Sequence, residues 1–517
     1  MKRTFLAAIA LAMGFIAIAG PKLSFPRSYA EDKKGYMSEA YWKIWNEEEQ
    51  ARIDADIEKY RKADAELKIE DLGRNRKVKV EQISHEFYFG AHIFNFNQLG
   101  KKEYNDRYKR SYGELFNSAT VPFYWRHLEW ERGKPRFETA ENDTEEWWNN
   151  CPDPKSQFHW RRPSTDQIVE FCEKKGIRMH GHVLVWGLRG HGMARWWPDL
   201  LTPSEFEAWK KFYTKKGGTY SIRNEKATEE WKKMPVEESE KFFPDFHKAI
   251  DAAWEARIKQ IAERYKGRID SWDVVNESAQ DYERKQLLED RTICKSSQYG
   301  LMSGDYPYKA LKWAEKYFPS EVKLNINDYR KRPIYTTQVK RLQERGCKID
   351  IMGIQMHIFN VKMCQKMADG HKYQTPTQVR RYVNWASQTG LPLHMSEITI
   401  SSPTQDERGL MIQAILAQNL YRLWFSQKNM MGITWWNTVD DCGLKKEPAV
   451  SGIFTRDMKE KPAYWALDQL INHEWKTNTT VKADKEGNVE FRGFKGKYRI
   501  TYKDKSGKVK SIEYTVK

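Results

Sequence analysis

Two glutamates stand where the chain could carry out acid–base and nucleophilic chemistry. Glu277 directly follows the strand-like run 269–276, and Glu397 lies near the end of a second such run, 391–398. Hydrolysis of a glycosidic bond with retention needs one carboxylic acid that protonates the leaving oxygen and one carboxylate that attacks the anomeric carbon, about 5–5.5 Å apart. Two carboxyl groups on opposite sides of one barrel mouth can flank a sugar ring in this way. A single glutamate after a strand is more often a surface residue, so the assignment depends on the surroundings of the pair.

The elements that must position these glutamates alternate between strand and helix. Helical patterns at 164–175, 248–265, 306–316 and 408–425 separate eight β-rich runs, and a long helix without Pro or Gly is expected before them at 38–66. The eight runs are 87–93, 118–125, 177–186, 269–276, 322–328, 349–358, 391–398 and 432–439. This alternation predicts an α/β fold in the form of a closed (β/α)8 TIM barrel with parallel strands.

The barrel is expected to carry additions. Residues 1–30 are predicted to be a signal peptide and leader, 31–473 the catalytic barrel, and 474–517 a small module of alternating strands. Two polar insertions, 138–163 and 200–247, follow barrel strands. We therefore expect both insertions at the C-terminal face of the strands, where the active sites of such barrels form.

The N-terminus predicts export. Lys2 and Arg3 precede the apolar run 5–20, a pattern typical of a secretory signal, so the protein is expected to be secreted or periplasmic. No later run offers about 18 apolar residues for a membrane span. The six cysteines contain no C-x-x-C pair, which disfavours a structural zinc site. Their pairing and the oligomeric state stay open.

The charge of the chain raises the question of an anionic partner. The net charge is +17, but basic residues alternate with acidic ones along the predicted helices, as on a solvated mixed-charge surface. No nucleic-acid-binding signature is present, so we expect no nucleic-acid partner. No cofactor is implied. An acidic polysaccharide is the remaining class of anionic partner.

Several strings around the two glutamates occur in the order of a known family. They are RMHGHVLVW, RYKGRIDSWDVVNES, KLNINDY, IDIMGIQMH, HMSEITIS, ITWWNTVDD and IFTRDMKEKPAYWAL. These strings resemble glycoside hydrolase family 10, the endo-β-1,4-xylanase family, over residues 55–470. The resemblance implies a polysaccharide substrate and a retaining mechanism, with Glu277 as acid/base and Glu397 as nucleophile.

The resemblance also implies roles for residues beside the glutamates. Asn276 matches the amide that hydrogen-bonds the sugar 2-hydroxyl, and His357 matches the histidine that contacts the nucleophile. A donor at His357 should keep Glu397 ionised, while burial and the charge of Glu397 should keep Glu277 protonated. Four more residues are expected to bind the reacting sugar, the last of them as its aromatic floor: His182, Trp186, Gln355 and Trp436.

The chain departs from the family pattern in the sugar-binding positions. The family usually has a Glu-Asn pair and a Lys at the end of the second strand, where this chain reads ATVPFYWRHLEW. Gly187, Leu188 and Arg189 replace the usual His, Ser and Gln, and Thr399 replaces the Asp that orients the strand-six histidine. These changes leave the identity of the substrate open.

Other residues are candidates to rebuild the sugar-binding wall. Arg189 and Arg195 could favour an acidic substituent such as a uronic acid. Stacking and guanidinium contacts could come from Tyr124, Trp125, Arg126, Trp147 and Trp148.

Three functions follow from these patterns. The leading one is endo-hydrolysis of β-1,4 bonds in xylan or a xylan-like plant polysaccharide. The second is a glycosidase with the same mechanism on a different decorated or acidic β-glycan, and the third is a secreted carbohydrate-binding barrel without turnover. No metal is expected, because His180 and His182 are taken to project to opposite faces of a strand and to chelate poorly.

Overall fold

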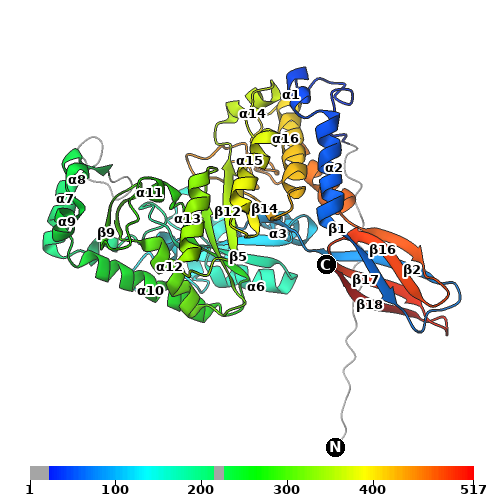
Figure 1. Ribbon diagram of the computed structural model, residues 1–517, viewed down its shortest axis with the longest axis horizontal. Coiled ribbons are helices and arrows are strands. Elements are labelled where there is room, and N and C mark those ends of the chain that lie inside the picture. The colour runs from blue at the N-terminus through cyan, green and yellow to red at the C-terminus, as the bar shows by residue number, and fades with distance from the viewer. Residues whose placement is uncertain (1–22, 215–225) are drawn as a thin grey trace, which may run out of the picture.

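Eight parallel strands close into a barrel at the centre of the molecule (Figure 1). The computed structural model describes residues 23–214 and 226–517, so residues 1–22 of the predicted signal peptide and leader lie outside the described residues. Around the barrel the strands follow one another as β11, β12, β13, β14, β3, β4, β5 and β8. Their bounds are β3 Tyr88–His92, β4 Ser118–Pro122, β5 Arg178–Val185, β8 Ser271–Asn276, β11 Lys323–Asp328, β12 Ile351–His357, β13 Leu393–Thr399 and β14 Met430–Trp435. The predicted TIM barrel is confirmed, and each strand overlaps one of the eight predicted runs.

The strands form because their residues are buried on both faces of the sheet. Every residue of β8 and of β13 is buried, as expected of parallel strands covered by helices. Gly181 in β5 is required by packing, since a Cβ at this position would lie 2.2 Å from the ring of Trp272 in β8.

Helices cover the outside of the barrel between successive strands. Two of them begin with a polar side-chain cap: Thr375 and Gln378 form a capping box at α15, and Asp406 accepts the N–H of Gly409 at α16. The covering helices are α3 Lys102–Glu114, α6 Thr165–Lys175, α10 Phe246–Arg264, α12 Tyr306–Tyr317, α13 Pro333–Glu344, α15 Pro376–Ser387, α16 Glu407–Phe425 and α17 Pro462–Asp468. A further helix, α14 Val361–Ala368, lies between β12 and α15.

Three segments interrupt this alternation after β4, β5 and β8. The segment after β4 holds α4 Trp125–Leu128 and α5 Glu145–Asn150, and the segment after β8 holds α11 Ala279–Glu283 with the hairpin β9 Ile293–Ser297 and β10 Gly300–Ser303. The segment after β5 contains α7 Pro203–Phe212, α8 Glu229–Lys233 and α9 Val236–Ser239, at the end of the molecule opposite the small sheet (Figure 1). All three follow the C-terminal ends of barrel strands.

The N-terminal helix prediction at 38–66 is wrong at two places. The helix is interrupted at Trp45, so that α1 Glu39–Ile44 and α2 Glu47–Arg61 are separate, and Asn46 caps α2 by accepting the N–H of Glu49 at 2.9 Å. After α2 the chain turns into strand β1 Lys62–Lys68. Pairing with a distant strand therefore overrides the local helix preference of these residues.

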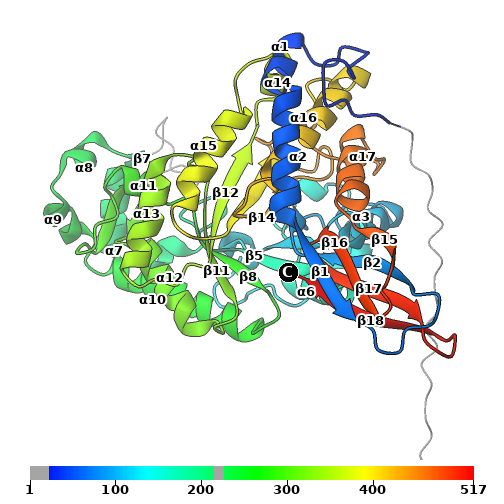
Figure 2. The same cartoon turned by 45° about the vertical axis from the view of Figure 1, so that its right-hand side comes forward.

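The C-terminal strands build a small antiparallel unit together with residues from the N-terminal half (Figure 2). Strand β1 pairs with β16 Asn488–Phe494, and β2 Lys77–His85 lies between β15 Asn478–Lys482 and β17 Gly496–Lys503, with β18 Val509–Val516 at the edge. The unit has its own apolar core, which includes Val78, Val80, Val489 and Ile500. Residues 62–85, which were assigned to the barrel from the sequence, thus share this core.

All six cysteines lie within the described residues. None of the six cysteines is in a disulfide, and five of them are buried. In the described ranges, no helix has the length and apolar character needed to cross a membrane.

Candidate active site

Glu277 and Glu397 lie in one cavity of about 460 Å³ at the C-terminal mouth of the barrel. Glu277 comes directly after β8 and has a φ of 60°, in the left-handed region, while its N–H donates to the carbonyl of Asn327 at 2.8 Å. Glu397 lies within β13 and is 5% exposed. All the residues predicted for the site line this cavity, namely Glu277, Glu397, Asn276, His182, Trp186, Gln355, His357 and Trp436.

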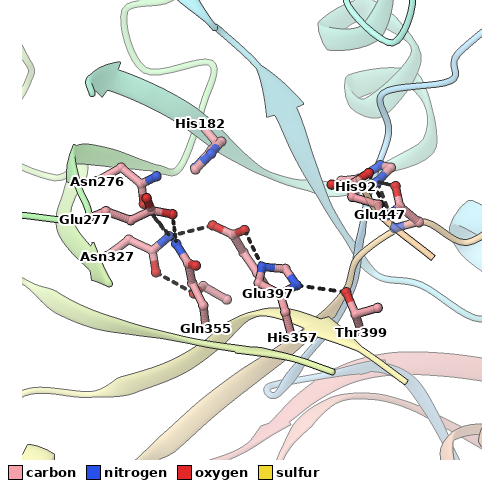
Figure 3. A network of polar contacts seen from close by, with 12 residues as sticks. His92, His182, Asn276, Glu277, Asn327, Gln355, His357, Glu397, Thr399 and Glu447 are labelled. Carbon is pink, nitrogen blue, oxygen red and sulfur yellow. Dashed lines mark hydrogen bonds and ion pairs between the residues drawn. The ribbon is translucent and has the colours of Figure 1, made fainter. Parts of the chain in front are cut away.

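A chain of amide hydrogen bonds connects the two carboxyl groups (Figure 3). Asn327 Nδ2 donates to Glu397 Oε1 at 2.8 Å and to Asn276 Oδ1 at 3.0 Å. Gln355 Nε2 donates to the same Asn276 oxygen at 3.2 Å and to Glu277 Oε1 at 3.1 Å. Because two donors hold Asn276 Oδ1, the Nδ2 of this residue is oriented as a donor for a ligand. The network therefore positions both carboxyl groups and one amide donor together.

Asn327 at the end of β11 is the centre of this network. Ser396 Oγ donates to Asn327 Oδ1 at 2.6 Å, which fixes the amide so that its Nδ2 faces Glu397. Gly353 on the adjacent strand β12 makes room for the amide, since a Cβ there would lie 2.5 Å from Asn327 Oδ1. A small residue at position 353 is therefore part of how Glu397 is held.

His357 contacts the second oxygen of Glu397. Its Nε2 lies 3.0 Å from Glu397 Oε2, and its Nδ1 lies 2.8 Å from Thr399 Oγ1. A neutral imidazole satisfies both contacts when Nε2–H donates to the carboxylate and Nδ1 accepts from the hydroxyl. Thr399 thus occupies the place behind the histidine without adding a negative charge.

Glu277 is held in surroundings that favour its protonated form. Burial raises the pKa of the Glu277 carboxyl, the hydrogen bond from Tyr299 acts against this, and the negative charge of Glu397 raises the pKa again. The Tyr299 hydroxyl and the Trp186 Nε1, the latter at 3.2 Å, both donate to Glu277 Oε2. Glu277 therefore has the properties of a general acid, and Glu397, which Asn327 and His357 contact as donors, those of a nucleophile.

His182, which lines the cavity, forms a polar cluster with His180 and Asp273. Its Nδ1 lies 2.8 Å from Asp273 Oδ2, and His180 Nε2 lies 2.9 Å from the same oxygen. Burial works against the cation, but the contact with Asp273 and the charge of Glu397 outweigh burial and raise the pKa of His182. The expectation that His180 and His182 project to opposite faces is wrong, because residues two apart on a strand share a face.

The opposite wall of the cavity is built from aromatic and basic residues. Trp436, Phe94 and Tyr124 form a buried cluster against which Trp186 packs. The guanidinium of Arg162 lies 3.7 Å from the centre of the Tyr124 ring, and Arg161 lies beside it in the same wall. Tyr124 belongs to the segment at the end of the second barrel strand, where the chain departs from the family pattern.

Most of the residues expected to rebuild this wall are elsewhere. Trp125 is buried and donates to Glu129 at 2.7 Å, and Trp148 donates to Asp143 at 2.8 Å. The positions that do not line the cavity, contrary to expectation, are Trp125, Arg126, Trp147, Trp148, Arg189 and Arg195. Of the proposed set only Tyr124 lines the cavity.

The two arginines proposed to bind an acidic substituent have other contacts. Arg189 is buried, donates to the carbonyl of Leu301 and lies 4.4 Å from the ring of Trp197. Arg195 is exposed and lies 4.6 Å from the ring of Trp130. The expectation for Arg189 and Arg195 is therefore wrong, and the basic residues in the cavity are different ones.

Sequence reasoning missed several cavity and supporting residues. Asn327 ends the fifth predicted strand as a polar residue in KLNINDY, which is a usable signal for a strand-end site. The others come from loops without such a signal: Arg161, Arg162, Tyr299, Lys331 and Glu447.

Comparisons with known proteins find similarity to xylanases. A model of glycosyl hydrolase family 10 matches residues 230–470. The chain is 24% identical over 345 residues to endo-1,4-beta-xylanase A of Thermotoga maritima, covering 64% of this chain and 27% of that protein. It is 23% identical over 341 residues to endo-1,4-beta-xylanase B of Thermotoga neapolitana, covering 64% of this chain and 79% of that protein. The chain thus spans about a quarter of the length of the first of these relatives.

Several solved xylanase structures align with this chain, of which one serves as an example. The native xylanase 10B from Thermotoga maritima aligns with a TM-score of 0.47 at 18% identity, covering 75% of this chain and 96% of that one.

Proposed function

This chain belongs to glycosyl hydrolase family 10, and we propose that it is a retaining glycosidase that cleaves internal β-1,4 bonds of xylan or a xylan-like plant polysaccharide. The observation that supports the proposal most strongly is the amide network that joins Glu277 to Glu397. A protein that only binds sugar has no need of two carboxyl groups joined in one cavity by such a network. The names of the xylanases that it resembles favour xylan as the backbone.

The first half of the proposed reaction forms a glycosyl-enzyme. Glu277 gives its proton to the leaving oxygen while Glu397 Oε attacks the anomeric carbon, so that a C–O bond to Glu397 forms as the glycosidic bond breaks. Asn276 Nδ2 donates to the 2-hydroxyl of the reacting sugar, a hydrogen bond that strengthens in the oxocarbenium-like transition state. The aromatic face of Trp436 supports the sugar ring.

The second half releases the sugar. Once Glu397 is esterified its negative charge is gone, so the charge that helped to raise the pKa of Glu277 no longer acts. Glu277, now a carboxylate, takes a proton from water, and the water oxygen attacks the anomeric carbon and displaces Glu397. The product keeps the β configuration.

The experiment is a substrate panel with paired variants. Wild type, Glu277→Ala and Glu397→Ala are incubated with β-1,4-xylan, glucuronoxylan, arabinoxylan, mixed-linkage glucan and cellulose, and new reducing ends are measured. Glu207→Ala on the exposed helix α7 is the matched control, because Glu207 lies outside the cavity. We expect release from a xylan that both cavity variants abolish and the control retains. Release by none of the proteins, with the fold intact, would contradict xylan as the substrate and leave a glycosidase on a different β-glycan or a carbohydrate-binding barrel.

Export is proposed on the sequence alone. Lys2, Arg3 and the apolar run 5–20 have the order of a secretory signal. N-terminal sequencing of the protein recovered from its native cells and medium tests this: a mature chain in the cytoplasm that still starts at Met1 would contradict it.

A further inference from the structure

Two consecutive arginines from the loop before α6 enter the wall of the cavity. Arg161 and Arg162 are 1% and 4% exposed, and both line the cavity. Arg161 has a φ of 61°, in the left-handed region that side chains rarely adopt. Such a backbone persists only where surrounding contacts hold it, so the loop is built to place these two side chains.

Arg161 forms an ion pair with a neighbouring carboxylate. Its Nη1 lies 3.0 Å from Glu447 Oε2, and its Nη2 donates to Asn437 Oδ1 at 2.6 Å and lies 3.1 Å from His92 Nε2. Glu447 Oε2 also accepts the N–H of Leu444 at 2.6 Å. Arg161 and Glu447 therefore neutralise each other and anchor the loop (Figure 3 shows Glu447 beside His92).

Arg162 differs from Arg161 because it has no anionic partner. Its Nη1 donates to the carbonyl of Arg161 at 2.7 Å, its guanidinium stacks on Tyr124, and its Nε is buried without a hydrogen-bond partner. Among the described residues no carboxylate is within ion-pair distance of Arg162. Glu447, which lines the same cavity, pairs with Arg161. A buried, unpaired guanidinium is costly, and the cost is relieved when an anion binds to it.

The remaining charges of the cavity also favour an anion. Lys331 contributes a second cation, with its Nζ donating to the carbonyl of Gln355 at 3.0 Å. Three carboxyl groups line the cavity: burial raises the pKa of Glu277, Glu447 pairs with Arg161, and Glu397 is the third. A guanidinium stacked on an aromatic ring keeps its planar edge available for the two oxygens of a carboxylate.

We propose that Arg162 binds the carboxylate of a uronic acid unit of the substrate, so that this cavity selects acidic β-glycans over neutral ones. This inference rests on the proposed glycosidase function and specifies its substrate class. The site lies against Tyr124 and Trp436, in the part of the cavity where the residues typical of the family are absent. A sugar ring that packs on Trp436 would bring a carboxylate near the guanidinium, because Arg162 and Trp436 both contact the ring of Phe94.

The experiment compares one polymer with and without its carboxylates. Glucuronoxylan and the same preparation with its carboxyl groups reduced to alcohols are used as substrates for wild type, Arg162→Gln and Arg195→Gln. Arg195 is the matched control, an arginine on a Trp ring outside the cavity. We expect kcat/KM of wild type and of Arg195→Gln to be about ten-fold or more higher on the acidic polymer, because a hydrogen bond to a charged group is lost on reduction. Arg162→Gln should show no preference. Equal cleavage of the two polymers by wild type would overturn the inference and leave the glycosidase function intact.

A binding measurement separates this inference from the choice of xylan. The thermal midpoint of each protein is measured with D-glucuronate, D-galacturonate and, as neutral controls, D-glucose and D-galactose. Stabilisation by a uronate in wild type and Arg195→Gln, but not in Arg162→Gln, supports the inference even if neither xylan is cleaved. Equal effects of acidic and neutral sugars, or no effect of either uronate together with no cleavage, would overturn it. If Arg162→Gln does not fold, Arg162→Lys is used, which keeps the charge and loses the planar fork, and a preference unchanged from wild type would count against the inference.

Discussion

Replacing Tyr299 by Phe tests the assignment of Glu277 as the acid. The substitution removes only the hydroxyl that donates to Glu277 Oε2, and Trp186 Nε1 still donates to that oxygen at 3.2 Å. Hydrogen bonds to charged groups contribute about 1.5–3 kcal/mol and those between neutral groups about 0.5–1.5 kcal/mol. The Tyr299 hydrogen bond therefore favours the ionised form of Glu277 by about 1–1.5 kcal/mol, or about one pKa unit.

The sign of the change follows from the same hydrogen bond. Tyr299 lowers the pKa of Glu277 against the effect of burial, so its removal should raise that pKa further. The alkaline limb of the pH profile of kcat/KM, where the acid loses its proton, should move up by about one pH unit. The acidic limb should stay in place, because the Tyr299 hydroxyl donates to Glu277.

The assay needs a control that loses a similar hydroxyl elsewhere. Tyr306→Phe removes a buried donor to Asp281, at 3.0 Å, outside the cavity. It should lower stability but leave both limbs of the profile unchanged. An alkaline limb that stays in place or moves down in Tyr299→Phe would refute the argument that Glu277 is the protonated acid.

Two further predictions follow from contacts around the site. Gly353→Ala places a Cβ 2.5 Å from Asn327 Oδ1 and should displace the Asn327 amide that donates to Glu397. We expect kcat to fall by about 10- to 100-fold. Steady-state kinetics measures this, with circular dichroism to show that the fold is unchanged, and an unaltered kcat would count against the network. Burial alone would raise the pKa of Glu447, but Arg161 and a backbone N–H hold this pKa at about 2, below the usual 4.5 of a glutamate. The pair therefore contributes about 3 kcal/mol above pH 4.5, and this contribution is lost as the pH falls towards 2. The stability difference between wild type and Glu447→Gln in urea titrations should shrink from pH 7 to pH 3, and a constant difference would contradict the linkage.

The barrel could be predicted from the sequence because its strands are buried on both faces. Runs such as 349–358 are nearly continuous in apolar residues, and short helical patterns separate them. The glutamates could be found because they end such runs. The end of the N-terminal helix could not be predicted, because Lys62–Lys68 forms a strand that pairs with Asn488–Phe494, far along the chain. Local preference contains no information about such a partner.

The supporting residues of the site were harder to predict for a related reason. Tyr299 reaches Glu277 from a hairpin whose path depends on tertiary packing, and Arg162 comes from a loop held by the pair of Arg161 and Glu447. Residue type alone suggested Arg189 and Arg195 as the basic residues of the cavity. Which arginine enters a cavity is decided by how the insertions fold back, and the sequence has no local signal for that.

The most direct test of the central claim is to trap the glycosyl-enzyme. Wild type is incubated with a 2-deoxy-2-fluoro β-glycoside of the best sugar from the panel that carries an activated leaving group, and the protein is digested and analysed by mass spectrometry. We expect one glycosyl group to be added to the protein, on Glu397, and none to be added to Glu397→Ala. A turnover-competent enzyme that accumulates no adduct and releases an α-configured product, or an adduct on a residue other than Glu397, would contradict the retaining mechanism proposed here.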